Sequence, residues 1–484
     1  MKKTAKLFSC MLFVLTVNVA FPQTDEEVAA RKVDSLFTSY NAQTPGAAIA
    51  IIKEGKIVLT KGYGMADLDH DIPITPQTVF NIASVSKQFT AFAVYLLESE
   101  GKLSFDDNIR KYIPELPRYA EDIRIRHLLA HTSGLRDQWA LLSLAGWRMD
   151  DVITTPQILK LLARQKNTNF RPGTRFNYNN TGYTLLAEIV ARISGKDFAT
   201  FCQEKIFQPL GMTSTQFYDD YEKIVKNKAE SYERINNTFH HRSLNVSNTG
   251  PSNLLTTVED LAKWVLNFEN PVVGNSRLIQ AFNEPSYLDN GNKVVLRIFG
   301  KGDTIFHAKG QNLSSYKGAR MITHGGHTAA FRTFLGRFPD QHFAIIALSN
   351  DEHNETLRAR WQIADFYIKE ALKDEPQSIS AAPQNKMSDP SPVYADNLKN
   401  FTGEYYNDEV KTAYTIENRA GKLVMTHIRL ADMELKRTGE NKFTGSGEQV
   451  FSFETEFVKD KNGMATAFLI SNFGVTNLRF EKVK

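Results

Sequence analysis

The sequence predicts an α+β protein, with an antiparallel sheet flanked by helices in its first part and a small all-β domain at its end. Three observations support this prediction. Strand patterns occur near both ends of residues 24–373 with helical patterns between them, a proline-rich stretch follows at 374–392, and short alternating patterns fill 393–484. A length of 484 residues exceeds one ordinary domain, and 42% hydrophobic with 23% charged residues is typical of globular proteins.

Residues 1–23 have the pattern of a secretory signal peptide. Three early lysines precede an apolar run over residues 7–21, which is short for a membrane span, and an acidic segment follows. We therefore expect a secreted or periplasmic bacterial protein with no stable transmembrane segment after cleavage; an uncleaved anchor is the alternative. Cleavage removes the three lysines and one of the two cysteines. The mature chain is then nearly neutral, keeps Cys202 alone without a disulfide, and has no basic patch for nucleic acid.

The first domain, residues 24–373, begins with a predicted β-hairpin. Apolar runs at 47–52 and 57–61 flank a turn that contains Gly55. Apolar residues at three- and four-residue steps then predict a helix over 88–103. Further patterns predict helices at 156–164, 183–194, 258–267 and 361–372, and strands at 319–323, 330–338 and 343–349. Strands from both ends of the domain are expected to meet in one antiparallel sheet, with the helices packed on it.

A linker is predicted at 374–392, where four prolines occur among Ser, Gln, Asn and Ala. The segment after it, 393–484, contains short strand patterns separated by turns. The strongest of these patterns lie at 414–417, 423–425, 451–454, 467–470 and 477–483. Short strands at regular spacing predict a small all-β barrel or sandwich.

Ser84 and Lys87 form a Ser-x-x-Lys string at the beginning of the predicted helix. The free N–H groups and partial positive charge of a helix N-terminus stabilise negative charge on a serine oxygen. A lysine three residues later lies on the same helical face, and in a dry site its lowered pKa lets it act as a base. Two other copies, at Ser99–Lys102 and Ser314–Lys317, do not stand at a helix start. An N-cap serine with a solvated lysine is the alternative to a catalytic pair.

Tyr178 and Asn180 lie in a polar stretch before the predicted helix at 183–194. A tyrosine phenol near a lysine can be partly ionised and relay a proton, and an asparagine can hold a substrate amide. The alternative is a loop capped by asparagine, since Tyr405 and Asn407 repeat the pattern in the C-terminal domain. We expect Tyr178 to be catalytic and Asn180 to bind substrate.

His324, Gly325 and Gly326 separate two predicted strands. Glycines at such a place let a substrate backbone approach the strand closely. The N–H of His327 would then join the N–H of Ser84 as an oxyanion hole. We therefore expect His324, Gly326 and His327 to bind substrate.

The sequence lacks the signature motifs of other hydrolase classes. A His-Gly-Gly string also resembles the oxyanion motif of lipases, but their Gly-x-Ser-x-Gly elbow is absent from the sequence. The His-Glu-x-x-His zinc motif is absent as well, and the remaining histidines show no metal-ligand spacing. We expect no metal and no cofactor.

Taken in order, the three strings resemble those of the penicillin-recognising serine hydrolases, and above all the class C β-lactamase-like branch with its D-aminopeptidases, D-Ala-D-Ala carboxypeptidases and esterases. The resemblance covers residues 34–372 and includes further strings at 128–135, 209–212 and 253–262. It implies a β-lactamase/transpeptidase-like fold with an all-helical lobe.

The resemblance also implies a role for each residue of the first two strings. Ser84 would attack a carbonyl and form an acyl-enzyme, which water then hydrolyses. Lys87 and Tyr178 would move the proton, with either one as the acylation base, and Asn180 would position the substrate.

The third string departs from the family pattern, because many members have Lys-Thr-Gly where this chain has His324-Gly325-Gly326. Histidine is mostly neutral at pH 7 and cannot replace a permanent cation for a substrate carboxylate. A histidine at this position is similar to the D-aminopeptidase and esterase members of the family. Some of these members also carry a lipocalin-like barrel; residues 393–484 would fit such a domain, which would restrict access to the site. We expect a serine hydrolase of small peptide, amide or ester substrates with D-residues or cell-wall fragments; a β-lactamase, a penicillin-binding protein and a non-catalytic ligand sensor are the alternatives.

Overall fold

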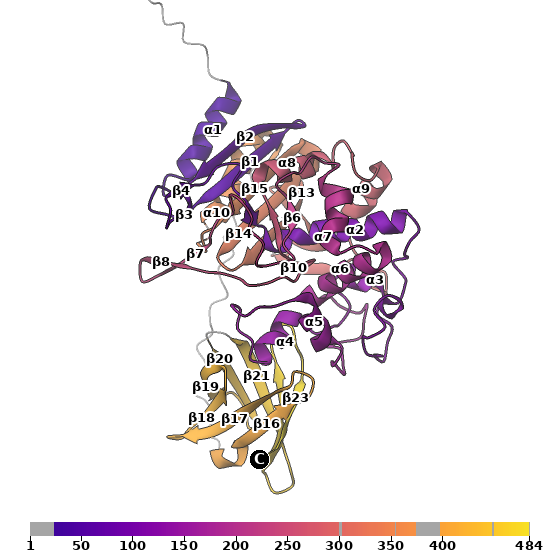
Figure 1. Ribbon diagram of the computed structural model, residues 1–484, viewed down its shortest axis with the longest axis vertical. Helices are drawn as coiled ribbons and strands as arrows, with labels where there is room; N and C mark the ends of the chain where they lie inside the picture. Colours follow the sequence, from indigo (N-terminus) through magenta and orange to yellow (C-terminus); the bar gives the residue numbers. More distant parts are fainter. Residues whose placement is uncertain (1–23, 300–302, 354, 374–396, 448–449, 484) are drawn as a thin grey trace, which may run out of the picture.

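The computed structural model describes residues 24–299, 303–353, 355–373, 397–447 and 450–483 (Figure 1). The predicted signal peptide, 1–23, and the predicted linker, 374–392, lie outside the described residues. In the described part of the chain, no helix is long and apolar enough to cross a membrane.

One eight-stranded antiparallel sheet is the centre of the first domain. Its strand order, β10-β11-β12-β13-β14-β15-β1-β2, brings the first two strands of the chain beside the last one of the domain. Its strands are β1 (Ala47–Lys53), β2 (Lys56–Tyr63), β10 (Val295–Phe299), β11 (Asp303–Ala308), β12 (Gln311–Tyr316), β13 (Ala319–Thr328), β14 (Phe331–Phe338) and β15 (Phe343–Ser349). The predicted hairpin and the meeting of both ends in one sheet are confirmed, since Ala50 pairs with both Thr60 and Ile346.

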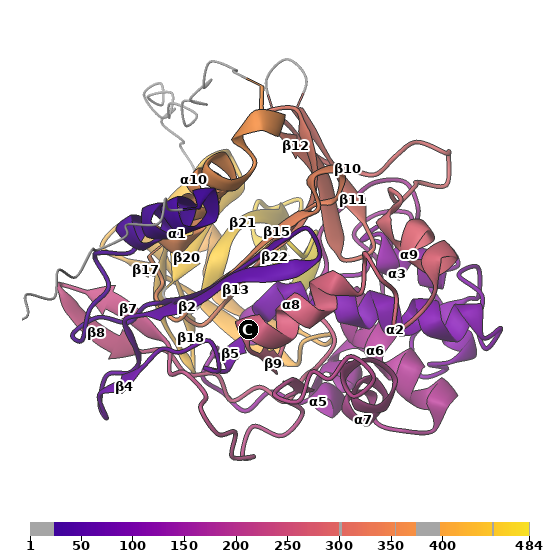
Figure 2. The same ribbon diagram turned by 90° about the horizontal axis from the view of Figure 1, so that it is seen from above.

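Helices cover both faces of this sheet (Figure 2). On one face, α1 (Asp25–Leu36) and α10 (Glu355–Tyr367) bury Val33 and Ile363 against the apolar side chains of β1 and β15. On the other face, α8 (Val258–Leu266) packs on β1 and β15 beside a helical lobe. Because both faces are covered, every residue of β1 from Ala47 to Ile52 is buried, which explains its continuous apolar run.

The helical lobe contains the helices nearest to the candidate site. They are α2 (Lys87–Ser99), α3 (Ile125–Leu129), α4 (Gln138–Leu144), α5 (Thr155–Leu162), α6 (Asn180–Ser194), α7 (Phe198–Cys202) and α9 (Ser276–Asn283). The predicted helix over 183–194 begins earlier than expected, because the Asn179 side chain caps it by accepting from Gly182 N–H. Gly195, with φ 70°, ends it in the left-handed conformation that favours glycine.

Short strands and single helical turns lie between the longer elements of the chain. The strands are β3 (Met65–Asp67), β4 (Ile72–Pro73), β5 (Phe80–Asn81), β6 (Gln216–Phe217), β7 (Tyr232–Ile235), β8 (Thr238–His241) and β9 (Leu254–Thr256). The turns are η1 (Ala83–Ser86), η2 (Ile109–Lys111), η3 (Gln203–Phe207), η4 (Pro339–Gln341), η5 (Lys369–Ala371) and η6 (Leu398–Phe401). Strand β5 matters most for the site, because it pairs with β9 and leads directly into η1.

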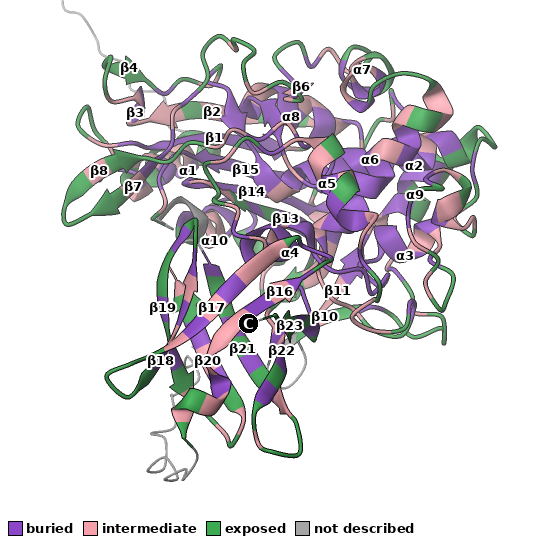
Figure 3. Ribbon diagram, turned by 60° about the horizontal axis from the view of Figure 1, so that its bottom comes forward, coloured by how far each residue is buried: buried purple, intermediate pink, exposed green. Residues whose placement is uncertain are grey.

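The C-terminal domain is a closed barrel, so the sequence-based alternative of a sandwich is wrong. Its eight strands are β16 (Gly403–Asn407), β17 (Thr412–Arg419), β18 (Lys422–His427), β19 (Leu430–Arg437), β20 (Lys442–Gly447), β21 (Val450–Lys459), β22 (Ala465–Ser471) and β23 (Leu478–Lys482). Buried and exposed residues alternate along these strands (Figure 3), with Phe453 and Phe457 of β21 pointing inward. The barrel lies beside α4 and α5 of the helical lobe (Figure 1).

Candidate active site

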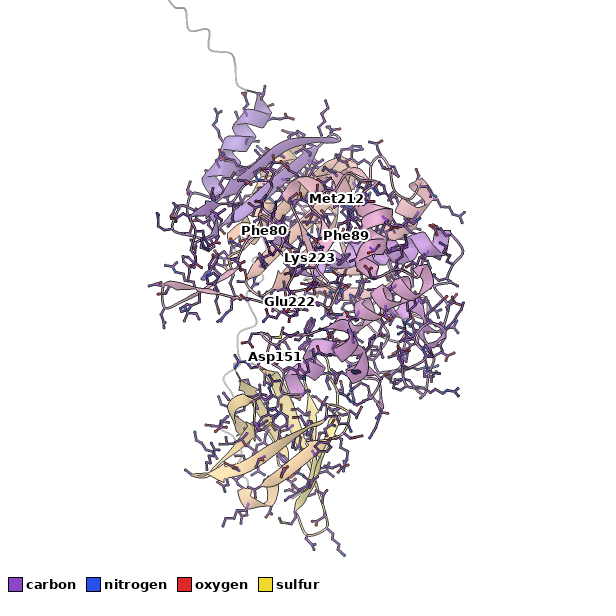
Figure 4. The ribbon with its side chains drawn as sticks, viewed as in Figure 1. Phe80, Phe89, Asp151, Met212, Glu222 and Lys223 are labelled. Atoms are coloured by element: carbon purple, nitrogen blue, oxygen red, sulfur yellow. The ribbon has the colours of Figure 1, made fainter. Side chains whose placement is uncertain are left out.

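The nucleophile candidate Ser84 lies in η1, between β5 and α2. It is partly exposed, whereas Ala83 and Val85 on either side are fully buried. Ala83 has a φ of 50°, which is uncommon for a residue other than glycine and turns the chain sharply before Ser84. The Ala83 N–H donates to Oδ1 of Asn81 over 2.9 Å, which holds this turn. Figure 4 labels Phe80 and Phe89, which bracket the segment inside the domain.

The Lys87 ammonium group has three partners at hydrogen-bond distance. Its Nζ lies 3.1 Å from Ser84 Oγ, 2.9 Å from Asn180 Oδ1 and 2.7 Å from the Pro251 carbonyl oxygen. Asn180 Oδ1 and the Pro251 carbonyl can only accept hydrogen bonds. A neutral amine therefore donates its two N–H groups to them and directs its lone pair at the hydroxyl of Ser84. This arrangement is the geometry that a base needs to take the Ser84 proton.

Burial makes the neutral form of Lys87 accessible near physiological pH. The side chain is fully buried, and this desolvation lowers its pKa from 10.5 to about 7. The negative charge of Asp137 opposes the shift and raises the pKa. The rings of Tyr178 and Tyr183 also lie close, with centroids 4.8 and 5.6 Å from Nζ.

Tyr178, in the loop directly before α6, contacts the same serine. Its hydroxyl donates to Ser84 Oγ over 2.9 Å. Burial raises the pKa of Tyr178 above its usual value of 10, which disfavours the partial ionisation that the sequence led us to expect. Tyr178 is thus a neutral hydrogen-bond donor beside Ser84, and Lys87 is the group that can accept a proton there.

Asn180, the first residue of α6, is held by a residue that the sequence patterns did not single out. Its backbone N–H and its Nδ2 donate to Oδ2 of Asp137 over 2.7 and 3.0 Å. Both donors face the carboxylate, so the side-chain carbonyl Oδ1 is directed at Lys87. Asp137 is also the N-cap of α4, and its Oδ1 accepts from the N–H groups of Trp139 and Ala140. An aspartate directly before an apolar helical run is an N-cap signal, and this signal could have located it.

His131 supports the loop that carries Tyr178 and Asn180, and it was also missed as a site residue. Its Nδ1 accepts the backbone N–H of Asn179 over 3.1 Å, and its ring lies 4.5 Å from the ring of Tyr178. Burial lowers the pKa of His131 well below 6.5, which keeps the ring neutral and its Nδ1 available as an acceptor. Its φ of 56° marks a tight turn at this position.

His324, Gly325 and Gly326 lie inside β13 rather than between two strands, which corrects the prediction of a break at this string. His324 is 6% exposed, and its Nδ1 lies 2.6 Å from the Gly325 carbonyl oxygen. Burial, reinforced by the charge of Lys87, lowers the pKa of His324 to about 4. The histidine is therefore neutral at pH 7, as the sequence led us to expect.

Gly326 brings β13 against the nucleophile segment. A Cβ at this position would lie 2.4 Å from the Ile82 carbonyl oxygen and 2.2 Å from Oγ1 of Thr333, so only glycine fits. Pairing of β13 with β12 stops at Thr323, and within the described residues the part of β13 from His324 to Thr328 pairs with β14 alone. This strand also lies beside η1, which carries Ser84.

The structure thus brings Ser84, Lys87, Tyr178 and Asn180 into direct contact and places β13 beside them. Among the described residues, no group of three His, Cys, Asp or Glu side chains is arranged to hold a metal ion. The four residues place a serine hydroxyl beside an amine that can accept a proton and a phenol that can donate one.

A family model described as Beta-lactamase matches residues 33–368 of this chain. The D-aminopeptidase of Brucella anthropi is 30% identical over 311 residues, which cover 64% of this chain and 56% of that protein. The D-aminopeptidase of Brucella melitensis is 26% identical over 410 residues, which cover 84% of this chain and 72% of that one. Protein flp of Staphylococcus aureus is 29% identical over 315 residues, which cover 63% of this chain and 59% of flp.

Solved structures share the fold at lower sequence identity. A penicillin-binding protein homologue from Pyrococcus abyssi has a TM-score of 0.60 and 21% identity, over 95% of this chain and 100% of that one. The D-amino acid amidase from Ochrobactrum anthropi has a TM-score of 0.58 and 21% identity, over 72% of this chain and 100% of that one. These matches confirm the predicted fold class.

Proposed function

The chain belongs to the beta-lactamase family of serine hydrolases, and on that premise we propose that it is an exported enzyme that cleaves peptide, amide or ester bonds through an acyl-enzyme on Ser84. The proposal of export rests on the signal-peptide pattern of residues 1–23. The proposal of mechanism rests on one observation: the buried amine of Lys87 has acceptors for two N–H groups and a lone pair left for the hydroxyl of Ser84.

In the proposed acylation, the Ser84 proton moves to Lys87 Nζ while Oγ forms a bond to the substrate carbonyl carbon. The N–H groups of Ser84 and His327 stabilise the resulting oxyanion. When the tetrahedral intermediate collapses, the bond to the leaving nitrogen or oxygen breaks. Tyr178, whose phenol is protonated in the free enzyme, donates a proton to the leaving group and recovers one from the Lys87 ammonium.

Deacylation is proposed to reverse these steps with water in place of the leaving group. Lys87, neutral again, takes a proton from the water that attacks the acyl carbon and passes it to Ser84 Oγ as the ester bond breaks. Asn180 fixes Lys87 throughout, and the second N–H of its amide can donate to the substrate carbonyl.

We propose that the substrates are D-aminoacyl amides, short D-residue peptides or esters. Substrates with a free carboxylate that must be bound by a positively charged side chain are disfavoured. The support is the neutral, buried His324 on the strand that would hold the substrate. The relatives named D-aminopeptidase agree with this choice.

A substrate panel tests this proposal. Wild type and Ser84→Ala would be assayed with D- and L-aminoacyl p-nitroanilides, short acyl esters and nitrocefin. We expect turnover of D-aminoacyl amides or esters that Ser84→Ala abolishes. Turnover that persists in Ser84→Ala contradicts the mechanism, and nitrocefin as the only substrate turned over would make the protein a β-lactamase instead.

A further inference from the structure

The turn between β22 and β23 of the barrel reaches the residue that holds Asn180. The Gly474 carbonyl oxygen accepts the backbone N–H of Asp137 over 2.8 Å and Nδ2–H of Asn169 over 2.9 Å. The Asn169 Oδ1 in turn accepts the N–H of Thr476 over 2.8 Å. Three hydrogen bonds therefore tie this turn to the helical lobe, and one of them ends on Asp137 itself.

Gly474 fits against Asp137 because it has no side chain. A Cβ at Gly474 would lie 2.5 Å from the Asp137 Cβ and 3.0 Å from the Ala140 Cβ, both on the rigid start of α4. The φ of Gly474 is outside the left-handed range, so available space alone requires glycine here. The turn is also fixed from within, since Oδ1 of Asn472 accepts the N–H groups of Gly474 and Val475.

A second barrel loop, between β16 and β17, holds Arg136, the residue directly before Asp137. Oε2 of Glu409 lies 2.8 Å from the Arg136 guanidinium, with side chains 9% and 3% exposed, and it also accepts the N–H of Lys166 over 2.7 Å. The Glu409 carbonyl oxygen accepts from Nε of Arg164. A buried ion pair with these extra hydrogen bonds fixes the position of both partners.

Other residues of the barrel also contact the helical lobe. Buried apolar side chains of the barrel and of the helical lobe form one continuous cluster. The Tyr414 hydroxyl donates to the Leu144 carbonyl over 3.1 Å, and Arg429 pairs with Asp151, which lies at the edge of the first domain next to the barrel (Figure 4). The barrel is therefore docked over α4 by apolar, ionic and backbone contacts together.

We propose that the barrel completes the active site, with Gly474 and Glu409 acting as positioning residues for Asp137. Asp137 accepts from both donors of Asn180, and Asn180 Oδ1 receives the Lys87 amine. A chain of hydrogen bonds thus runs from the barrel turn through Asp137 and Asn180 to Lys87. This inference rests on the proposed role of Lys87 as the base that activates Ser84.

The expected consequence of moving Asp137 is a change in the orientation of Asn180. Without the carboxylate in place, the backbone N–H and the Nδ2–H of Asn180 lose their acceptor. The Oδ1 atom of Asn180 is then no longer held toward Lys87. Small displacements of positioning groups reduce the rate of a reaction by about tenfold to 100-fold. The negative charge that favours protonated Lys87 also moves away, so deprotonation of Lys87 becomes easier.

The test compares Gly474→Ala with Gly439→Ala in the full chain. Gly439 lies in another barrel turn with an ordinary φ, and a Cβ there meets the flexible Lys442 side chain at 3.2 Å. A fluorophosphonate probe would report the rate at which Ser84 is labelled as a function of pH, and hydrogen exchange would report the N–H groups of Asp137 and Asn180. A third variant, Glu409→Gln, removes the ion pair without adding volume and guards against a folding defect in Gly474→Ala.

We expect Gly474→Ala and Glu409→Gln to label about tenfold to 100-fold more slowly, with a pH midpoint below that of wild type and faster exchange at Asp137 and Asn180. Gly439→Ala should match wild type. Unchanged exchange at both amides, or a slower rate without a shift of the midpoint, would overturn the inference. If wild type is not labelled at all, the proposed function fails, and the exchange measurement still decides whether the barrel positions Asp137.

Discussion

Lys87 Nζ donates to Asn180 Oδ1 over 2.9 Å, although the two residues come from different helices. This contact fixes the amine of Lys87 on one side, as the Pro251 carbonyl does on another, and leaves Ser84 as its third neighbour. Full burial then lowers the pKa of Lys87 to about 7. Position and protonation state together support the proposal that this lysine is the base of the site, and separate variants can test each of them.

Replacing Lys87 by arginine keeps a positive charge but removes the base, because a guanidinium does not lose its proton in this pH range. We expect Lys87→Arg to lower the rate of Ser84 labelling by about 100- to 10,000-fold. The matched control is Lys102→Arg, in the exposed copy of the Ser-x-x-Lys string, which should label as wild type. Fast labelling of Lys87→Arg would mean that another group activates Ser84.

Replacing Asp137 by asparagine removes the negative charge that raises the pKa of Lys87. The acid limb of the pH–rate profile should therefore move to lower pH, because neutral Lys87 then forms at lower pH. The maximal rate should also fall, since Asn180 loses part of its acceptor. The exposed Asp150→Asn is the control, and an acid limb that stays in place or moves to higher pH would contradict this role of the Asp137 charge.

Replacing Tyr178 by phenylalanine removes the hydroxyl that donates to Ser84 and keeps the ring that packs on His131. Because the phenol is proposed to protonate the leaving group, amides should lose more activity than esters of good leaving groups. We expect a loss of about 100-fold or more in kcat/KM for amides. Tyr406→Phe, in the barrel, serves as the control. Equal losses for amides and activated esters would argue against proton donation by Tyr178.

Gly326 and Gly325 should differ sharply in their tolerance of a methyl group. A Cβ at Gly326 overlaps the Ile82 carbonyl oxygen and Oγ1 of Thr333, so Gly326→Ala must push β13 away from η1. A Cβ at Gly325 meets its nearest atom, the Thr333 carbonyl oxygen, at 3.7 Å. We expect Gly326→Ala to lose activity and about 1–3 kcal/mol of stability, whereas Gly325→Ala keeps its Tm. Similar Tm values for the two variants would show that the close approach of β13 is not required.

Burial of Lys87 should also make stability depend on pH. Its pKa is about 7 in the folded state and 10.5 when exposed, so between these values the unfolded state binds more protons. The contribution of this group to the free energy of unfolding therefore rises with pH from 7 to 10.5. We expect Lys87→Met to be more stable than wild type at pH 7, with a difference that narrows toward pH 10 in chemical denaturation. A difference that stays constant or widens would contradict the lowered pKa.

Local sequence patterns could predict the fold and the reacting groups because both are encoded in short segments. The apolar run of β1, the periodicity of α2 and the Ser84-x-x-Lys87 string are all readable within a few residues. His324 could be predicted to be neutral from its residue type, and burial lowers its pKa further. The order of the strings along the chain then indicated the family.

The contacts that hold the site could not be predicted in the same way, because they join distant parts of the chain. In the sequence, Asp137 has only the pattern of an ordinary helix N-cap. Its contact with Asn180 is formed only in the folded structure. Pro251 contributes only a backbone oxygen, which no side-chain pattern marks. Gly474 lies in a barrel turn whose contact with Asp137 depends on how the two domains dock.

The pH dependence of phosphonate labelling at Ser84 tests the central claim most directly. Peptide mapping by mass spectrometry would locate the label, and the second-order rate constant would be measured from pH 5 to pH 9. If neutral Lys87 deprotonates Ser84, the rate should rise with a midpoint near pH 7 and the rise should vanish in Lys87→Arg. A rate that does not depend on pH across this range, or a midpoint that is the same in Lys87→Arg, would contradict the account.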